Sequence, residues 1–196
     1  MRGEPIESVK AGMNALTTSL RHNPYALETV WLSLITYDLE AKLLVPLTDV
    51  DDFQLPEIPV PQTSPTNLGE ALDLLFERYD YEVRLSTPTA KGDWLPILVI
   101  MTDGAPSDTF AFKQGVEKLK RYRFSRIICC AAGPKAKVEP LKQLTNDVYS
   151  LQTMDAATFS RFWDWVSATV ETHSQGSVGA LTEELPPPPA EIILVK

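Results

Sequence analysis

Residues 95–108 read LPILVIMTDGAPSD, and this stretch decides the fold. Its apolar run, Leu95 to Met101, predicts a strand that is buried on both faces of a sheet. Asp103 follows at the carboxyl end of this strand, where open α/β sheets place their ligand sites. We therefore take Asp103 as the first candidate functional residue. The alternative is that its carboxylate only stabilises a turn.

Strands and helices are expected to alternate on both sides of this stretch. Helices are predicted from Pro5 to about Leu20, from Leu68, from Asp108 to about Arg121, from Pro140 to Leu144 and after a capping Asp155; strands are predicted at Thr29–Tyr37, Lys42–Leu47, Arg126–Ala132 and Val148–Leu151. The first two of these strands are close enough to form a hairpin. The pattern predicts an α/β, Rossmann-like, doubly wound and mostly parallel sheet flanked by helices, to which the hairpin adds one antiparallel edge strand.

The chain is expected to divide into one domain and a tail. Residues 1–173 carry the periodic apolar pattern, and residues 174–190 include four consecutive prolines and predict an extended, mobile segment. The last six residues, EIILVK at 191–196, resemble a strand. Because an exposed apolar strand promotes aggregation, we expect it to be docked against the sheet.

Composition limits the classes of function. A formal net charge of −8 over 196 residues argues against non-specific binding of nucleic acid or an anionic membrane. Cys129 and Cys130 are adjacent in an apolar run, so their side chains should point to opposite faces of a sheet as buried thiols. We expect no signal peptide and no membrane-spanning segment, and therefore a cytoplasmic protein.

Three motifs together resemble the von Willebrand factor A (VWA) domain family. They are RGEPI at 2–6, PTNLGEAL at 65–72 and MTDG at 101–104. The resemblance is nearest to the VWA proteins of bacterial tellurium-resistance and stress operons (TerY-like), and it extends over nearly the whole chain.

This resemblance implies a metal-ion-dependent adhesion site (MIDAS) at the carboxyl edge of the sheet. In the family an Asp-x-Ser-x-Ser motif, a threonine and an aspartate supply the ligands, and the last two match Thr66 and Asp103. Oxygen ligands of this kind suit Mg²⁺, with Mn²⁺ or Ca²⁺ as alternatives. An acidic side chain of a protein partner would complete the coordination shell.

The sequence departs from the family at its beginning. The family's Asp-x-Ser-x-Ser motif and the strand before it would precede Met1 and are absent, so we expect weak or no Mg²⁺ binding and a sheet without its middle strand. Either the translation start is set too far downstream or this is a short form. The segment 191–196 could fill the slot, within one chain or by exchange in a dimer. Alternatively, it adds at an edge of the sheet.

We therefore predict a non-enzymatic interaction module. The resemblance to the TerY-like proteins implies that it serves a tellurite or stress-response system, with kinase or phosphatase components among its partners. One alternative is a metal-assisted phosphohydrolase that uses Asp103 with Asp49, Asp51 and Asp52. No glycine-rich phosphate-binding motif supports that reading, and such an acidic cluster is more often a solvated turn. The remaining alternative is an inert structural fragment.

Overall fold

Strands and helices alternate through most of the chain, as predicted. The structure is a computed structural model that describes residues 1, 3–60, 65–175 and 186–195. The helices are α1 Glu4–His22, α2 Pro24–Thr29, α3 Leu68–Glu82, α4 Thr109–Leu119, α5 Val138–Leu141 and α6 Ala156–Gln175; the strands are β1 Trp31–Tyr37, β2 Ala41–Asp49, β3 Ile97–Thr102, β4 Arg126–Ala132, β5 Val148–Leu151 and β6 Ile192–Leu194.

The main sheet has the strand order β3-β4-β5-β6. The pairs β3-β4 and β4-β5 are parallel, and β6 is antiparallel to β5. This arrangement confirms the predicted α/β class with a mostly parallel sheet.

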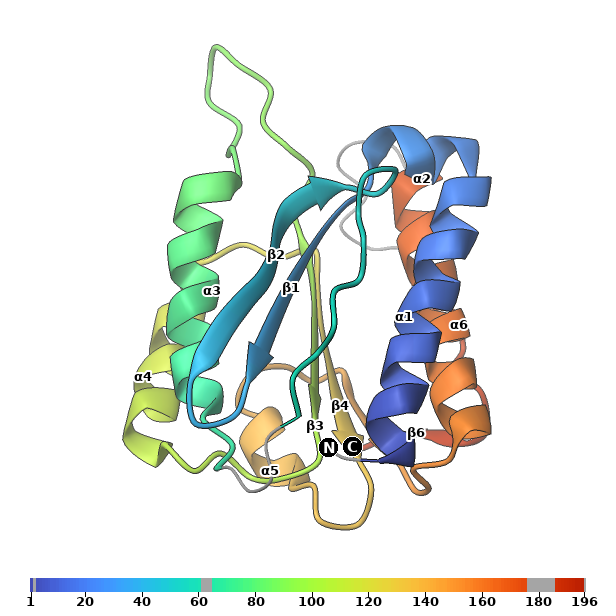
Figure 1. Ribbon diagram of the computed structural model, residues 1–196. Helices are drawn as coiled ribbons and strands as arrows, with labels where there is room; N and C mark the ends of the chain where they lie inside the picture. The colour runs from blue at the N-terminus through green and yellow to red at the C-terminus, as the bar shows by residue number, and fades with distance from the viewer. Residues whose placement is uncertain (2, 61–64, 176–185, 196) are drawn as a thin grey trace.

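The hairpin is where the structure departs from the prediction. β1 and β2 pair with each other and form a separate two-stranded antiparallel sheet. The hairpin was expected to extend the main sheet, but within the described residues no hydrogen-bonded ladder joins β1 to β3. The two strands nevertheless run side by side in the same direction (Figure 1).

Helices cover both faces of the main sheet, which creates two apolar cores. Leu16 and Leu20 of α1 pack with Phe159 and Phe162 of α6 on one face. On the other face, α3 and α4 bury a second cluster that includes Leu72. Figure 1 shows these helix pairs on opposite sides of the strands.

The two cysteines follow this division into layers. Cys130 belongs to the cluster under α1 and α6, whereas Cys129 belongs to the cluster under α3 and α4. Both thiols are free and buried. This confirms the prediction of buried thiols on opposite faces of a strand.

The position of β6 decides between the two alternatives for the last residues of the chain. Ile192, Ile193 and Leu194 pair with Leu151, Ser150 and Tyr149 of β5 in the same chain. The segment therefore adds at the edge, and the idea that it fills the slot beside β3 is wrong for this structure. Ile192 is buried under α6, where the apolar core compensates for ordering a short strand.

The last helix extends past the predicted limit of the domain at residue 173. α6 continues to Gln175, and residues 176–185 of the predicted mobile tail lie outside the described residues. Beyond them, the carbonyl oxygen of Pro186 accepts a hydrogen bond of 2.7 Å from Trp165 Nε1. Pro186, the first residue of the proline run, is thus hydrogen-bonded to α6.

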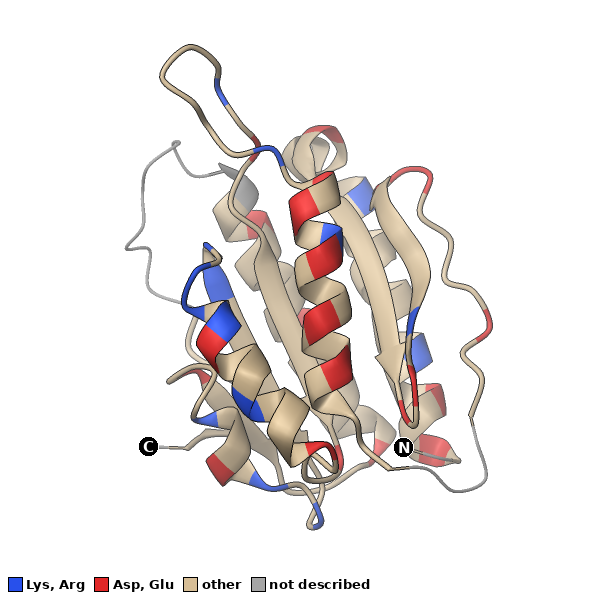
Figure 2. Cartoon of the chain, turned by 90° about the vertical axis from the view of Figure 1, so that its left-hand side faces the viewer, with Lys and Arg blue, Asp and Glu red and all other residues tan. Residues whose placement is uncertain are grey.

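Acidic side chains line the outer face of α3. Glu70, Asp73, Glu77 and Asp80 recur at helical spacing, and Figure 2 shows them as a column along this helix. Among the described helices, none is both long and apolar enough to cross a lipid bilayer.

Candidate metal site at the carboxyl end of β3

Asp103 is the first residue after β3. Thr102 Oγ1 accepts a hydrogen bond of 3.3 Å from the backbone nitrogen of Gly104, so the chain turns sharply around the aspartate. The Asp103 side chain is 38% exposed, and its Oδ2 lies 3.0 Å from the terminal ammonium of Met1. The carboxylate is therefore accessible, and it already has a cation beside it.

Thr66 approaches the same turn from a different loop. Its backbone nitrogen donates a hydrogen bond of 2.9 Å to Ser107 Oγ, and its carbonyl oxygen accepts one of 2.8 Å from the nitrogen of Ser107. A Cβ atom added to Gly104 would lie 3.0 Å from Thr66 Oγ1. The threonine hydroxyl thus faces the residue that follows Asp103, and Gly104 allows this approach because it has no side chain.

The Asp108 side chain bonds to the first turn of α3 and thereby holds the loop that carries Thr66. The sequence predicts it as the residue that opens α4, but its side chain makes no capping hydrogen bond there. Instead, its two carboxylate oxygens accept hydrogen bonds from the backbone nitrogens of Gly69, at 3.1 Å, and Glu70, at 2.8 Å. Asn67, at the N-cap of α3, makes no capping bond of its own. A negative charge at a helix N-terminus is favourable, so Asp108 holds the Thr66 loop beside the end of β3.

The turn of the hairpin completes this edge of the molecule. Asn67 donates hydrogen bonds from its backbone nitrogen to the carbonyl oxygen of Asp38, at 2.9 Å, and from Nδ2 to that of Leu39, at 2.8 Å. The Thr66 loop is thereby fastened on both sides, to the β1-β2 turn and to the loop after β3.

Sequence reasoning missed Ser107 and Tyr37 at this edge. The Tyr37 hydroxyl, at the end of β1, donates a hydrogen bond of 2.8 Å to the carbonyl oxygen of Met101 in β3. Burial raises the pKa of the Tyr37 hydroxyl, which keeps it in its donor form. The contact joins residues 64 positions apart, and no local pattern signals it.

The donor atoms suit a hard divalent cation. A hydroxyl and a carboxylate are oxygen ligands, and Mg²⁺ is commonly held by one or two carboxylates together with water. Within the part of the chain that the structure describes, no group of three or more His, Cys, Asp or Glu side chains gathers as a metal site. Thr66 and Asp103 therefore fit such an ion in kind, and most of its shell would come from water or from a partner.

The acidic loop lies too far away to assist Asp103. Asp49 pairs with Trp31 at the start of β1, whereas the Asp103 turn adjoins Tyr37 at the end of that strand. The seven residues of β1 separate them by about 20 Å, at ~3.3 Å per residue. Asp49 Oδ1 instead accepts a hydrogen bond of 2.9 Å from the nitrogen of Asp51, as in a solvated turn. Asp103 and the acidic loop therefore do not form the shared metal site that the hydrolase alternative requires.

Comparison with known proteins supports the fold. No family profile and no curated protein matches the sequence. Among solved structures, proximal thread matrix protein 1 from the mussel byssus superposes with a TM-score of 0.63 at 18% identity, over 84% of this chain and 42% of that one. The same protein with a zinc-occupied MIDAS motif gives a TM-score of 0.56 at 16% identity, over the same shares of the two chains.

A second protein gives the same result. The ArnB paralog VWA2 from Sulfolobus acidocaldarius superposes with a TM-score of 0.52 at 15% identity, over 80% of this chain and 40% of that one. The present chain thus spans less than half the length of each of these proteins. At these identities the likeness shows the fold alone, and that fold is of the VWA type.

Proposed function

We propose that this chain is a metal-dependent protein-interaction module of the MIDAS type, with Thr66 and Asp103 as its metal ligands. One observation carries the proposal: the Thr66 hydroxyl and the Asp103 turn, from two separate loops, meet at the carboxyl edge of a parallel sheet. This is the edge at which such sheets bind ligands. The MIDAS metal of a solved structure with the same fold is consistent with it.

The chemistry of binding follows from the donor set. A divalent ion held by one carboxylate and one hydroxyl keeps open positions, which an acidic side chain of a partner can occupy. Asp103 already pairs with the Met1 ammonium, so a metal must displace that cation. We therefore propose Mg²⁺ as the physiological ion, weakly bound by this chain, with Mn²⁺ and Ca²⁺ as substitutes.

Paramagnetic broadening by Mn²⁺ tests the site directly. In NMR spectra of the ¹⁵N-labelled chain, low Mn²⁺ concentrations should broaden the amide signals around Thr66, Gly104 and Ser107 first, and excess Mg²⁺ should restore them. Asp103→Asn should abolish this effect without changing the rest of the spectrum, because the amide keeps the shape and removes the charge. Thr66→Val should weaken it.

Asp51→Asn is the matched control, since it removes one carboxylate at the opposite end of β1. It should leave the broadening near Gly104 unchanged. Broadening that survives in Asp103→Asn, or that centres on the acidic face of α3, would contradict the assignment. N-terminal acetylation should strengthen Mn²⁺ binding, because it removes the competing ammonium.

The resemblance to TerY-like proteins supports a finer proposal about the biological system. We place the module in the cytoplasm, in a tellurite or stress response, with partners that include kinase or phosphatase components. The remaining metal ligands would be the Asp-x-Ser-x-Ser motif of a longer form. Residues joined before Met1 would begin next to Asp103, because the Met1 nitrogen lies 3.0 Å from its Oδ2.

A version extended by an apolar strand and Asp-x-Ser-x-Ser should therefore bind Mg²⁺ more tightly than the present chain, measured by isothermal titration. Asp103→Ala in that version should abolish both the tight binding and the capture of an acidic partner. Equal affinity of the two forms would contradict this finer proposal. If neither form bound metal, the result would favour the alternative that the chain is an inert structural fragment. We propose no enzymatic activity, and phosphatase and ATPase assays with and without Mn²⁺ should give no turnover.

A further inference from the structure

The loop after β4 brings two lysines to the edge that carries the candidate metal site. β3 and β4 pair in parallel as far as Thr102 and Ala131, so the two strands end side by side. Asp103 follows the first of these strands, and Lys135 and Lys137 lie in the loop after the second. Both lysines are exposed. The carboxyl edge of the sheet therefore carries basic groups beside the candidate metal ligands.

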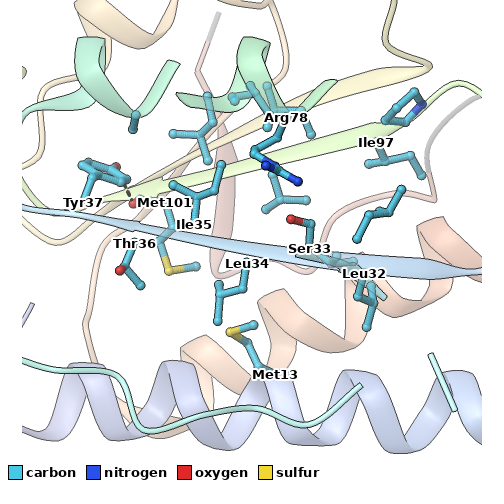
Figure 3. Close-up of a pocket in the computed structure, with 18 of the residues that line it drawn as sticks. Met13, Leu32, Ser33, Leu34, Ile35, Thr36, Tyr37, Arg78, Ile97 and Met101 are labelled. Carbon is cyan, nitrogen blue, oxygen red and sulfur yellow. Dashed lines mark hydrogen bonds between the residues drawn. The ribbon is translucent and has the colours of Figure 1, made fainter. Parts of the chain in front are cut away.

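The Lys135 side chain extends toward the metal site. A cavity of about 1610 Å³ lies between β1 and β3, and Thr66 and Asp103 line it at this edge. Lys135 lines it as well, although its loop follows β4, on the other side of β3. The side chain must therefore pass the end of β3, where Asp103 lies. Figure 3 shows how this end is held, by the hydrogen bond from the Tyr37 hydroxyl to the Met101 carbonyl oxygen.

Packing holds the lysine loop in one shape. Gly133 has a φ of 82°, a conformation that favours glycine, and its nitrogen donates a hydrogen bond of 3.0 Å to the Leu151 carbonyl oxygen. The nitrogen of Ala136 donates one of 3.3 Å back to Gly133. Met154 packs directly against this glycine, where a Cβ atom would overlap its sulfur. A ligand of the lysines therefore meets an ordered loop and does not have to order it.

Neither of these lysines has an anionic partner within the described residues. Other lysines of the chain form ion pairs with aspartate or glutamate, namely Lys10, Lys42, Lys118, Lys120 and Lys142. Asp155, which follows the Met154 that packs on the loop, accepts a hydrogen bond of 2.8 Å from the Thr158 nitrogen instead. Because the chain has a net charge of −8, a shortage of acids does not explain the unpaired lysines. Both ammonium groups are available to an external anion.

The position of Lys135 does not help the metal. An ammonium group near a divalent cation repels it, and this repulsion weakens binding of the ion. A ligand with one anionic group on the metal and a second on the lysine is attracted by both cations. The combination of a metal site and a neighbouring lysine therefore favours a partner that carries two negative groups.

The spacing of the two cations suits a peptide. Neighbouring strands are ~4.8 Å apart, and in an extended peptide the side chains of residues i and i+2 point the same way at a separation of ~6.6 Å. The flexible stem of a lysine accommodates the difference. Two acidic residues separated by one residue can therefore reach the metal and Lys135 together.

We propose that Lys135, with Lys137 beside it, binds a second carboxylate of the partner whose first carboxylate completes the metal shell. The partner is then an extended acidic segment of the form acid-x-acid. This inference rests on the proposed metal site and specifies which partner that site selects. The metal provides the anchor, and the lysines discriminate between partners by charge.

Matched peptides test the proposal. Acetyl-GAEAEAG-amide is titrated into the full ¹⁵N-labelled chain in saturating Mg²⁺, and the amide shifts of Gly104 and Ser107 report binding. GEAAAEG, with the same charge and length, is the spacing control, and GAEAQAG carries a single acid. We expect GAEAEAG to bind about two- to fivefold more tightly than the spacing control, the contribution of one exposed ion pair. High salt should remove this advantage.

Variants of the lysines complete the test as a double-mutant cycle. Lys135→Ala should remove the advantage of GAEAEAG and leave the affinity for GAEAQAG unchanged. Lys137→Ala should have a smaller effect in the same direction. Lys113→Ala, at an exposed lysine of α4, is the matched control and should change neither affinity. Broadening by Mn²⁺ near Gly104 should persist or strengthen in Lys135→Ala, because the repulsion is gone.

The possible failures are distinguishable. Equal affinity of the unmodified chain for GAEAEAG and GEAAAEG, or an equal loss with Lys113→Ala, would overturn the role of Lys135 and leave the metal site intact. Loss of Mn²⁺ broadening in Lys135→Ala would also overturn it, because the lysine would then only support the loops. Absence of Mn²⁺ broadening in the unmodified chain would overturn the metal site itself, and this inference with it.

Discussion

At the scale of single residues, the Asp108 carboxylate positions the candidate site although it is not one of the proposed metal ligands. Asp108 bonds to the first turn of α3, so it joins the loop after β3 to the loop that carries Thr66. The two loops lead into the N-termini of α3 and α4, and the residues that Asp108 joins lie 38 and 39 positions from it in the sequence. Their proximity therefore depends on Asp108, which is not a proposed ligand, together with the hydrogen bonds between Ser107 and Thr66.

Asp108→Ala should lower the free energy of unfolding by about 1–2 kcal/mol, the typical effect of losing a helix N-cap. Asp108→Asn should cost less, because the amide oxygen still accepts one hydrogen bond. Urea denaturation measures both changes. Glu28→Ala, at an exposed acid of α2, is the control with little expected effect, and an equal loss there would contradict the capping role.

The buried thiols predict a dependence of stability on pH. Burial raises the pKa of the Cys129 thiol from 9.0 to about 12. The folded state therefore keeps a proton that the unfolded state releases, so this contribution is complete below pH 9 and is lost as the pH rises toward 12. Between pH 9 and pH 10 the unfolding free energy should fall by about 1 kcal/mol from this group.

Denaturation at pH 8, 9 and 10 measures this effect, and Cys129→Ala should reduce the slope. Folded protein at pH 8 should also react with a thiol reagent only as fast as it unfolds, since the thiolate is the nucleophile. Rapid reaction of either cysteine in the folded state would contradict the burial described above.

Residue-level expectations succeeded where the cause was local. Asp155 accepts a hydrogen bond of 2.8 Å from the nitrogen of Thr158, the predicted cap of α6. Two adjacent cysteines in a strand must face opposite ways, and they do. Asp108 and Tyr37 could not be assigned in this way, because their partners lie 38 or more residues away in the sequence.

At the scale of elements, β6 shows how a strand of three residues is held in place. Its Ile192 side chain is 3% exposed and packs in the core, whereas Ile193, on the opposite face, is 41% exposed. Glu191, just before the strand, forms an ion pair with Arg161 of α6. The ladder with β5, the ion pair and one buried apolar side chain therefore hold β6 in place.

Ile192→Ala should destabilise the protein by about 2–5 kcal/mol, as for other buried aliphatic residues. Ile193→Ala is the matched control at the next position and should cost little. Thermal denaturation together with size-exclusion chromatography measures stability and assembly. Equal effects of the two variants, or a change of apparent size with Ile192→Ala alone, would contradict docking within one chain.

Most elements were predictable from the sequence, but two features were not. The pair Asn23-Pro24 predicts the end of α1, and it also begins α2, because the Asn23 side chain accepts hydrogen bonds from the nitrogens of Tyr25 and Ala26. A signal that ends one helix and starts another is ambiguous until the following residues are placed. The assignment of β1 and β2 to a separate sheet depends on pairings that local periodicity does not encode.

At the scale of the whole molecule, the gap between the edges of β1 and β3 divides the protein into two unequal parts. The four-stranded sheet has helices on both faces, whereas the β1-β2 hairpin packs mainly against α3. Within the described residues, the Tyr37 hydroxyl of β1 bonds to the Met101 carbonyl oxygen of β3 across this gap. The hairpin should therefore open without unfolding the main sheet.

Native-state hydrogen exchange should detect this difference. Amides of β4, which pairs on both sides and is buried, should exchange only through global unfolding. Amides of β1 and β2 should exchange with a lower free energy, and Tyr37→Phe should lower it further by about 1 kcal/mol. The same exchange rates throughout β1 and β4 would contradict two cooperative units.

The overall class was predictable because alternating strands and helices favour a parallel sheet covered on both faces. The candidate site was predictable only in part. Asp103 follows the carboxyl end of a predicted strand, where open α/β sheets place their ligand sites. Thr66, in contrast, was matched only through the family resemblance. The pairing of their loops through Ser107 and Asp108 required the tertiary structure.

The neighbouring thiols offer a practical consequence. Cys129 and Cys130 report on different apolar layers although they are joined by one peptide bond. In a pair of single-cysteine variants, a probe of thiol accessibility would time the opening of each layer separately. Whichever thiol reacts first under mild denaturant identifies the helix pair that detaches first, and thereby the order in which this fold comes apart.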